Sequence, residues 1–364
     1  MRPESLTPER PRTARPRLGV VFGGRSSEHG VSCLTAREVL AVIDTDRYDV
    51  VPIGIARDGR WVHETADWGD LAAGTLPEVN PELAPFAWDE LRDLDAVFPL
   101  LHGPWGEDGT VQGLLEMADV RYVGAGVLAS SVGMDKPFAK TVFAAGGIPQ
   151  LPYVTILPWE WKRERDRVAA RVRALGLPVF VKPARAGSSS GVMMVESWDE
   201  LDGAVEKARD FDPKVIVESA ARDKRELECG VIQQPDGRPL ASAVGEITVD
   251  AASTHEFYDF EAKYLDGTSS NLIPADIDTT LSERIRTLAV QAFEALGCEG
   301  LARVDFFWTP SAPGDGLVLN EINTMPGFTP FSMFPRLWEN SGIGYAELVD
   351  RLIQLALNRD AGLR

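Results

Sequence analysis

The feature that most limits the fold of this chain is an alternation of short apolar runs with helical stretches in its first third. Residues 17–22 (Arg-Leu-Gly-Val-Val-Phe) form a mostly apolar run that ends in Gly23-Gly24, which is typical of a buried strand entering a tight turn. A helical stretch continues to about Ile43, and further strand-like runs follow at 50–55 and 96–101. Strands that alternate with helices predict a parallel sheet with right-handed crossovers.

Two polar loops follow the predicted strands, at the sheet edge where ligands of such folds bind. The first loop is Gly-Gly-Arg-Ser-Ser-Glu28, and the second is His102-Gly-Pro-Trp-Gly-Glu-Asp-Gly. These positions predict one candidate site that contains both Glu28 and His102. Taken singly, His102 is also compatible with a buried, hydrogen-bonded histidine, and Glu28 with an acid in the first turn of a helix.

The remainder of the chain predicts a mixed α+β organisation, and a length of 364 residues favours two or three domains. We expect a helix over 136–145 capped by Asp135, a strand over 177–183 and a long amphipathic helix over about 282–296. For that last helix, Thr280-x-x-Glu283 is interpreted as a capping box and Gly297 as the end. Two more strands are expected at 302–307 and 317–323.

The domain boundaries are placed where the pattern changes. The first 16 residues are rich in Pro and Arg and are interpreted as a disordered leader. Gly124-Ala-Gly126 interrupts the first pattern, and a second change falls near residue 222. The predicted domains are therefore 17–128, 129–222 and 223–364.

Two predicted neighbouring strands carry residues suited to a hard metal ion. Asp305 lies on the first, and Glu321 and Asn323 lie two apart on the second, so the latter two face the same side. Two carboxylates and one amide oxygen suit Mg²⁺ or Mn²⁺. The alternative is an exposed hairpin with solvated carboxylates, in which Arg303 is a salt-bridge partner.

A Gly/Ser-rich loop follows the strand at 177–183. It reads Lys182-Pro-Ala-Arg-Ala-Gly-Ser-Ser-Ser-Gly191, and its backbone amides could face phosphate oxygens, with Lys182 and Lys136 adding charge. An ordinary surface loop is the alternative. The loop also matches G-x-S-x-G, which would make Ser189 the nucleophile of an α/β-hydrolase. That class needs a later acid and then a His, and the only His after Ser189 is His255, so we disfavour it.

Composition excludes several other classes. The net charge of -18 argues against nucleic acid as a partner. No apolar run is long enough for a membrane span. The three widely spaced cysteines form neither a disulfide framework nor a zinc pattern, so we expect core thiols and a cytoplasmic location.

Taken together, seven motifs resemble those of the D-alanine–D-alanine ligases of the ATP-grasp superfamily, in order from about residue 17 to the end. In sequence order they are Gly-Gly-Arg-Ser-Ser-Glu28, Leu-His102-Gly-x-x-Gly-Glu-Asp-Gly, Met-Asp-Lys136, Val-Lys182-Pro-x-x-x-Gly-Ser-Ser, Phe-Tyr258-Asp-Phe-Glu-Ala-Lys263-Tyr264, Ala-Arg303-Val-Asp305 and Asn-Glu321-Ile-Asn323-Thr-Met-Pro-Gly327. The resemblance implies a three-domain ATP-grasp fold, with an N-terminal parallel-sheet domain and ATP held between the central and C-terminal domains.

The resemblance also implies a role for each matching residue. The phosphates of ATP would contact Lys136, Lys182 and Lys263, and the rest of the nucleotide would lie near Phe180, Ser189, Glu218 and Glu226. Two Mg²⁺ (or Mn²⁺) ions would be held by Asp305, Glu321 and Asn323. The first D-alanine would bind Glu28, linked to Ser188 and Tyr264, and His102 is counted with this catalytic group. The oxyanion would face Arg303 and Gly327, while Ser332 and Tyr258 would contact substrate.

The implied reaction joins two D-alanines through an acyl phosphate, for peptidoglycan precursors, in an enzyme that is commonly a homodimer. Residues 250–273 have little periodicity and are expected to form a lid. The alternative within the ligases is a depsipeptide enzyme that uses D-lactate as its second substrate. Relatives of that kind lack the Tyr258–Tyr264 stretch or change its last tyrosine, so Tyr264 favours D-alanine.

Overall fold

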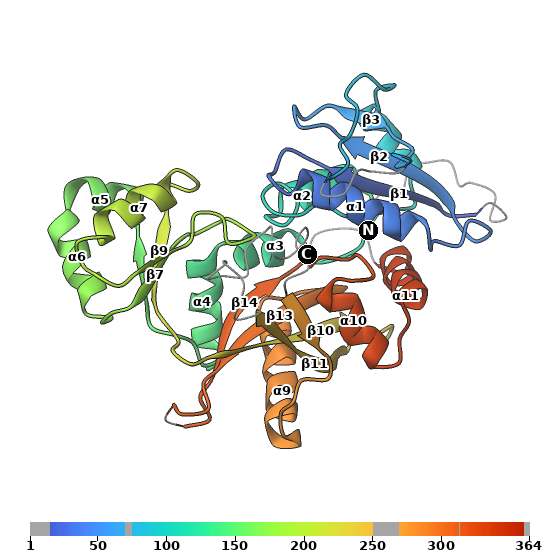
Figure 1. Ribbon diagram of the computed structural model, residues 1–364. Helices are drawn as coiled ribbons and strands as arrows, with labels where there is room; N and C mark the ends of the chain where they lie inside the picture. Colours follow the sequence, from blue (N-terminus) through green and yellow to red (C-terminus); the bar gives the residue numbers. More distant parts are fainter. Residues whose placement is uncertain (1–14, 70–74, 250–268, 313, 360–364) are drawn as a thin grey trace, which may run out of the picture.

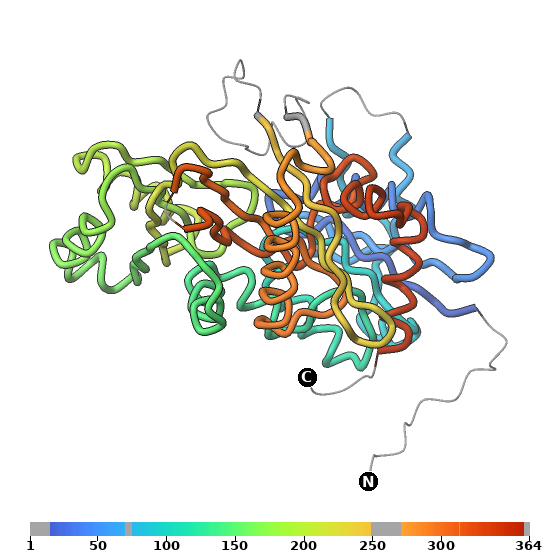
Figure 2. Tube along the Cα trace, turned by 90° about the horizontal axis from the view of Figure 1, so that it is seen from below, coloured from blue at the N-terminus to red at the C-terminus, as the bar shows by residue number. Residues whose placement is uncertain are grey.

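The computed structural model describes residues 15–69, 75–249, 269–312 and 314–359. It contains three β-sheets with helices packed around them, and the sheets follow one another along the chain (Figure 1). Seen from the perpendicular direction, the part that carries the central sheet projects from the rest of the molecule (Figure 2). In these described ranges no helix has both the length and the hydrophobicity needed to cross a bilayer.

The N-terminal sheet confirms the predicted parallel arrangement. Its strand order is β3-β2-β1-β4-β5, and β1 pairs in parallel with both β2 and β4. Only β3, at one edge, runs antiparallel to its neighbour. The strands are β1 (Arg17–Gly23), β2 (Asp49–Ile55), β3 (Trp61–His63), β4 (Ala96–Pro99) and β5 (Arg121–Tyr122), and the associated helices are α1 (His29–Leu40), η1 (Trp88–Asp93) and α2 (Thr110–Met117).

The central sheet is small and antiparallel, with the order β6-β9-β7-β8. It is built from β6 (Tyr153–Ile156), β7 (Val179–Pro183), β8 (Met193–Val195) and β9 (Val215–Ser219), with α5 (Pro158–Arg163), α6 (Arg165–Arg173) and α7 (Leu201–Arg209). Alternating residues of β7, such as Val179 and Val181, are fully buried in its core. Phe180 and Lys182 point to the opposite side and line the pocket described below.

The C-terminal sheet is also antiparallel and has the order β12-β11-β10-β13-β14. Its strands are β10 (Arg225–Gln233), β11 (Pro239–Val249), β12 (Ser269–Leu272), β13 (Leu301–Trp308) and β14 (Leu317–Asn323), and its helices are α9 (Thr279–Ala295), α10 (Met333–Asn340) and α11 (Tyr345–Leu357). On β10, Leu227 and Cys229 pack in one core with α9. Glu226 and Glu228 face the other side, so one face of this sheet is apolar and the other carries polar groups.

Two helix ends test the predicted caps. The Asp135 side chain accepts a hydrogen bond from the amide of Phe138 at 3.2 Å, which confirms the cap of α4 (Lys136–Ala145). The predicted capping box of α9 is wrong. Its N-cap is Asp278, which accepts from the amide of Leu281 at 2.8 Å, and Thr280 lies inside the helix. Asp278, two residues before Thr280, accepts from an otherwise unpaired amide of the first turn, so the helix begins earlier than predicted.

The cores connect segments that are distant in sequence. Helix α3 (Val127–Met134) and α4 contribute Ala129, Ala139 and Phe143 to the same core as α9. In turn, α11 packs against β4 and β5 of the N-terminal sheet. The predicted domain boundaries at residues 128 and 222 stay predictions. Helix α3 runs across the boundary at residue 128, so the structure has no break in packing there. All three cysteines are buried free thiols, as expected.

Candidate active site

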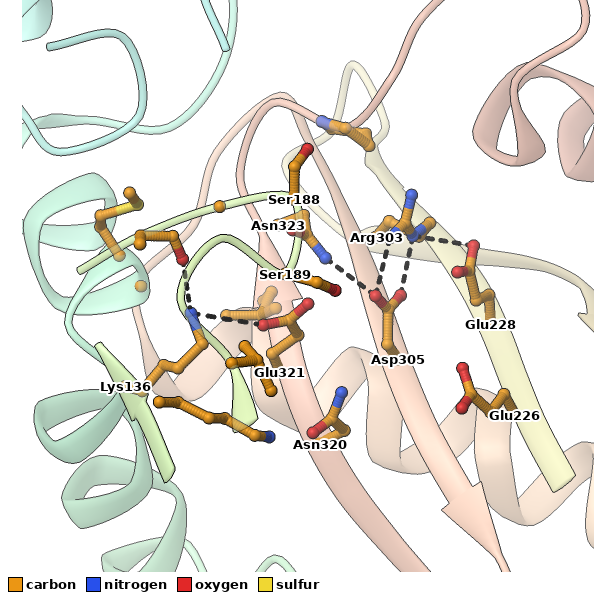
Figure 3. Close-up of a pocket in the computed structure, with 18 of the residues that line it drawn as sticks. Lys136, Ser188, Ser189, Glu226, Glu228, Arg303, Asp305, Asn320, Glu321 and Asn323 are labelled. Atoms are coloured by element: carbon orange, nitrogen blue, oxygen red, sulfur yellow. Dashed lines mark hydrogen bonds and ion pairs between the residues drawn. The ribbon is translucent and has the colours of Figure 1, made fainter. Parts of the chain in front are cut away.

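One pocket gathers residues from the loops of the N-terminal sheet and from both antiparallel sheets. Figure 3 shows the part of it that is formed by Lys136, the Gly/Ser-rich loop and the C-terminal sheet. Its walls come from the loops after β1 and β4, the start of α4, the Gly/Ser-rich loop after β7, and the strands β9, β10, β13 and β14. The pocket therefore unites most of the residues singled out from the sequence. These are Glu28, His102, Lys136, Phe180, Lys182, Ser188, Ser189, Glu218, Glu226, Arg303, Asp305, Glu321, Asn323 and Gly327.

Glu28 lies at the junction of two loops. The Ser188 hydroxyl donates to Glu28 Oε1 at 2.6 Å, although the two residues are 160 positions apart. A Cβ atom on Gly103 would lie 2.5 Å from Glu28 Oε2, and one on Gly187 would lie 2.8 Å from the same oxygen. At both positions the Glu28 carboxylate occupies the space that a side chain would fill, so a larger residue would displace this carboxylate. Ser188 itself has a left-handed backbone, with φ of 46°.

His102 is buried and hydrogen-bonded through both ring nitrogens. Nδ1 lies 3.1 Å from the carbonyl oxygen of Met325, and Nε2 lies 3.2 Å from Thr35 Oγ1. Because a carbonyl only accepts, Nδ1 carries the proton and Nε2 accepts from the threonine hydroxyl. Burial lowers the pKa of His102 and keeps the ring neutral, even though the charge of Glu28 opposes this shift. The ring therefore has no nitrogen left for a ligand.

Three carboxylates form a row across the polar face of the C-terminal sheet. Glu228 on β10 pairs in register with Asp305 on β13, which pairs with Glu321 on β14. Arg303 bridges two of them: its Nε and Nη2 donate to Asp305, each at 2.7 Å, and Nε lies 2.8 Å from Glu228 Oε2. Burial alone would lower the pKa of Arg303, but these carboxylates outweigh it and raise that pKa well above its usual value.

A β-bulge modifies this row. The register of β13 and β14 passes from Asp305–Glu321 to Phe306–Leu319, which leaves Asn320 as an extra residue. Leu317 and Leu319 are buried on the α9 side, whereas Asn320 and Glu321 both line the pocket. The bulge therefore adds an amide to the predicted group, as Figure 3 shows.

The donors Asp305, Glu321 and Asn323 fit a hard divalent cation. They are two carboxylates and an amide on adjacent strands that line one pocket. The Asn323 amide nitrogen donates to Asp305 Oδ2 at 3.0 Å, so any cation here shares that carboxylate with Arg303 and Asn323. Within the described part of the chain, no three His, Cys, Asp or Glu side chains gather as a metal-binding group. The candidate ligands in this pocket thus combine two carboxylates with one amide.

Lys136 and Lys182 line one side of the pocket, and Lys140 lies just behind it. Lys136 Nζ donates to the Ala186 carbonyl at 2.9 Å and lies 3.6 Å from Glu321 Oε2. Lys182 lies 2.6 Å from Glu218 Oε2, and the buried Lys140 lies 2.7 Å from Glu218 Oε1. Burial disfavours the charged form of Glu218, but the two ammonium groups outweigh it and lower its pKa to about 2. Glu218 is thus a counter-ion for both lysines.

Some predicted site residues are not brought into this pocket. Ser332 does not line it; the Ser332 hydroxyl instead accepts from the amide of Thr329 at 3.1 Å, just before α10. Tyr258, Lys263 and Tyr264 lie outside the described residues, as does most of the expected lid at 250–273. The end of that expected lid is the strand β12.

Sequence reasoning missed four residues of this region: Glu107, Lys140, Glu228 and Asn320. Two of them could have been found from the sequence. Glu107 belongs to the loop that begins at His102, and Glu228 lies two residues after Glu226, on the same face of one strand. Burial and the charge of Glu28 raise the pKa of Glu107 to about 8. Lys140 and Asn320 had no such signal, because their positions depend on sheet packing and on the bulge.

Comparisons with known proteins agree with this geometry. Residues 17–125 match the family model described as the D-ala D-ala ligase N-terminus, and residues 142–354 match that of the C-terminus. A D-alanine–D-alanine ligase of Pseudarthrobacter chlorophenolicus is 53% identical, with 96% of each chain covered. One of Streptomyces coelicolor is 51% identical, with 96% of this chain and 95% of the relative covered.

Solved structures show the same likeness. The VanG D-Ala:D-Ser ligase of Enterococcus faecalis is 34% identical with a TM-score of 0.78, and covers 94% of this chain and all of its own. The D-alanine–D-alanine ligase of Coxiella burnetii is 32% identical with a TM-score of 0.75, and covers 95% of this chain and 96% of its own. The ATP-grasp fold expected from the sequence is thereby confirmed. The pocket, the family models and these relatives together place the chain in the D-alanine–D-alanine ligase family.

Proposed function

We infer that this protein joins two molecules of D-alanine at the expense of ATP, and so supplies the dipeptide for peptidoglycan precursors. The observation that carries this function is the single pocket in which the N-terminal loops, the lysines of the central part and the carboxylate row of the C-terminal sheet meet. Family likeness over nearly the whole chain supports the same activity. The hydrolase alternative built on Ser189 is excluded by this family membership.

The reaction requires activation of a carboxylate, which is by itself a poor acyl donor. The carboxylate of the first D-alanine attacks the γ-phosphorus of ATP and displaces ADP, which gives an acyl phosphate. The deprotonated amine of the second D-alanine then attacks the acyl carbon, and collapse of the tetrahedral intermediate expels inorganic phosphate. The tetrahedral oxyanion that forms would be stabilised by the guanidinium of Arg303 and the amide of Gly327. Both groups line the pocket, and the ion pairs of Arg303 fix its guanidinium in place.

The nucleotide would bind between the central and C-terminal sheets. Lys136 and Lys182 would contact its phosphates, which requires each to exchange a carboxylate partner for a phosphate. Lys140 would then remain as the partner of Glu218. Phe180, Ser189 and Glu226 line the same region and would contact the rest of the nucleotide, while Lys263 is proposed on resemblance alone.

The family also requires a divalent cation, which when bound neutralises charge on the phosphates. We assign its ligands to Asp305, Glu321 and Asn323, and we propose two Mg²⁺ or Mn²⁺ ions. Their shared face and their donor chemistry support this assignment. A homodimeric assembly and a cytoplasmic location are further proposals that follow from the resemblance.

Glu28 would hold the ammonium group of the first D-alanine, and a change that displaces its carboxylate tests this role. In Gly187→Ala, the new Cβ would lie 2.8 Å from Glu28 Oε2, the mobile end of a side chain. Glu28 can move aside at little cost in stability but then leaves its binding position. We expect the KM for the first D-alanine to rise roughly tenfold, since a charge-assisted contact is displaced.

The matched control is Gly203→Ala, on α7 of the same region, where an added Cβ meets nothing within 4 Å. Steady-state kinetics and thermal unfolding of both variants provide the measurement. A KM for D-alanine in Gly187→Ala equal to that of Gly203→Ala would contradict the proposed role of Glu28.

The overall function is tested by phosphate release with ATP and Mg²⁺ in the presence of different amino acids. D-Alanine should stimulate release and L-alanine should not, and the product should be D-alanyl-D-alanine by mass spectrometry. Arms that add D-lactate or D-serine to D-alanine decide the second substrate, since one structural neighbour is a D-Ala:D-Ser ligase. Release that is indifferent to D-alanine would overturn the function, and a depsipeptide as main product would favour the D-lactate alternative.

A further inference from the structure

The backbone of Met325 is held from both sides by a single loop of the N-terminal domain. Its amide donates to Glu107 Oε1 at 3.2 Å, and its carbonyl oxygen accepts from His102 Nδ1 at 3.1 Å. Both partners are more than 200 positions earlier in the sequence, in the loop that follows β4. The N–H belongs to the peptide unit before Met325 and the carbonyl to the unit after it, so one loop restricts the rotation of both units.

The loop itself is fixed independently of Met325. The second oxygen of Glu107 accepts from the amide of Gly103 at 2.7 Å, and the amide of Glu107 donates back to the Gly103 carbonyl at 2.9 Å. The carbonyl of His102 accepts from the hydroxyl of Ser26 at 2.8 Å, which ties this loop to the one that carries Glu28. Glu107 therefore connects a rigid loop to Met325.

Met325 is the first residue of the short segment Met325-Pro326-Gly327, which carries the Gly327 amide. The Met325 side chain is buried in the core that also contains Phe328, and the carbonyl of Phe328 accepts from the Tyr345 hydroxyl at 2.8 Å. The segment is thus fixed at both ends. Pro326 has no amide hydrogen, so Gly327 is the first residue after Met325 whose N–H can face the pocket.

We propose that Glu107 is a positioning residue that sets the place of the Gly327 amide through its hydrogen bond to Met325. This inference rests on the proposed function, because it concerns the oxyanion of that reaction. A donor aimed at a developing charge is sensitive to small displacements, since hydrogen bonds weaken steeply with distance and angle. Loss of the Glu107 contact frees the peptide unit between Thr324 and Met325, and its rotation shifts the chain that leads to Gly327.

The test is Glu107→Gln, assayed at a pH above the raised pKa of about 8 so that the parent carboxyl is ionised. The change keeps the size of the side chain but presents an NH₂ group to one of the two backbone amides. The matched control is Asp108→Asn. Asp108 accepts from the amides of Trp105 at 2.9 Å and Thr110 at 3.0 Å, so its side chain is bonded within its own loop and not to Met325. We expect kcat for dipeptide synthesis to fall roughly tenfold to a hundredfold in Glu107→Gln and to stay within about twofold in Asp108→Asn.

A second measurement separates positioning from a general structural effect. A phosphinate analogue places a tetrahedral phosphorus and an anionic oxygen where the addition intermediate would have its oxyanion. Its affinity should fall in Glu107→Gln in proportion to kcat, whereas the affinity for ADP should be unchanged. Glu107→Asp, which withdraws the carboxylate, provides a second variant with the same expected pattern.

Three outcomes would overturn the proposal: a kcat in Glu107→Gln within about twofold of the parent, an equal loss in Asp108→Asn, or equal losses of affinity for the analogue and ADP. A parent protein that makes no dipeptide would instead overturn the proposed function, so the two failures are distinguishable. Thermal unfolding of each variant confirms that the comparison is made between folded proteins.

Discussion

Replacing Glu321 by Gln should reduce turnover roughly a hundredfold to a thousandfold while the protein stays folded. The exchange keeps the shape of the side chain and removes one of the two negative charges assigned to the cation. Glu321 stands directly across from Asp305 in the β13–β14 register and lies 3.6 Å from Lys136, on the proposed phosphate side of the pocket. Its loss therefore weakens cation binding and changes the charge that faces the phosphates.

The measurement is dipeptide synthesis over a range of Mg²⁺ concentrations, together with binding of Mn²⁺ in the presence of ADP. Glu294→Gln is the matched control, because Glu294 is an exposed residue of α9, on the opposite face of the sheet. It should leave both quantities unchanged. Near-normal turnover of Glu321→Gln at saturating Mg²⁺ would show that Glu321 does not hold the catalytic cation.

The residues of β14 show how far the sequence could predict this site. Period-two alternation placed Glu321 and Asn323 on one face, and the structure agrees. The same rule would place Asn320 on the opposite face, with Leu319 on the side of Glu321. The bulge at Asn320 breaks the alternation, and it arises from the pairing with β13 rather than from the local sequence.

Contacts between distant segments were less accessible to sequence reasoning. The Glu28–Ser188 bond and the ion pair of Lys140 with Glu218 depend on how segments far apart in the sequence pack against one another. The family resemblance anticipated the first of these, because its motifs carry that information. It gave nothing for Lys140, which from the sequence is simply a polar residue on a predicted helix.

The ends of elements were predicted with mixed success for a physical reason. Asp135 was recognised as a cap because it directly precedes a clear helix, and the bond to Phe138 confirms it. For α9, the side chains of Thr280 and Asp278 could both act as an N-cap. The cap is Asp278 because its backbone is extended, whereas Thr280 already has the helical conformation. That property is set by the whole chain and not by the two side chains.

Arg303 is the second position at which a large effect is expected, because it has both a catalytic and a structural role. Replacement by Met removes the guanidinium proposed to face the oxyanion, so kcat should fall roughly a hundredfold to a thousandfold. It also leaves Glu228 and Asp305, both nearly buried, without their shared cation. Breaking a buried pair in this way costs about 3–5 kcal/mol, so the free energy of unfolding should also fall.

A second change separates these two roles. In the double variant Arg303→Met/Glu228→Gln, one of the two unpaired carboxylates becomes neutral, so much of the lost stability should return, as measured by urea unfolding. Turnover should remain low, because the guanidinium is still absent. Arg303→Lys keeps a charge but cannot span Asp305 and Glu228 with a planar fork, so its turnover should lie between those of the parent and Arg303→Met. If the double variant recovers turnover along with stability, Arg303 acts only by holding the carboxylate row together, and the oxyanion must be stabilised by other groups in the pocket.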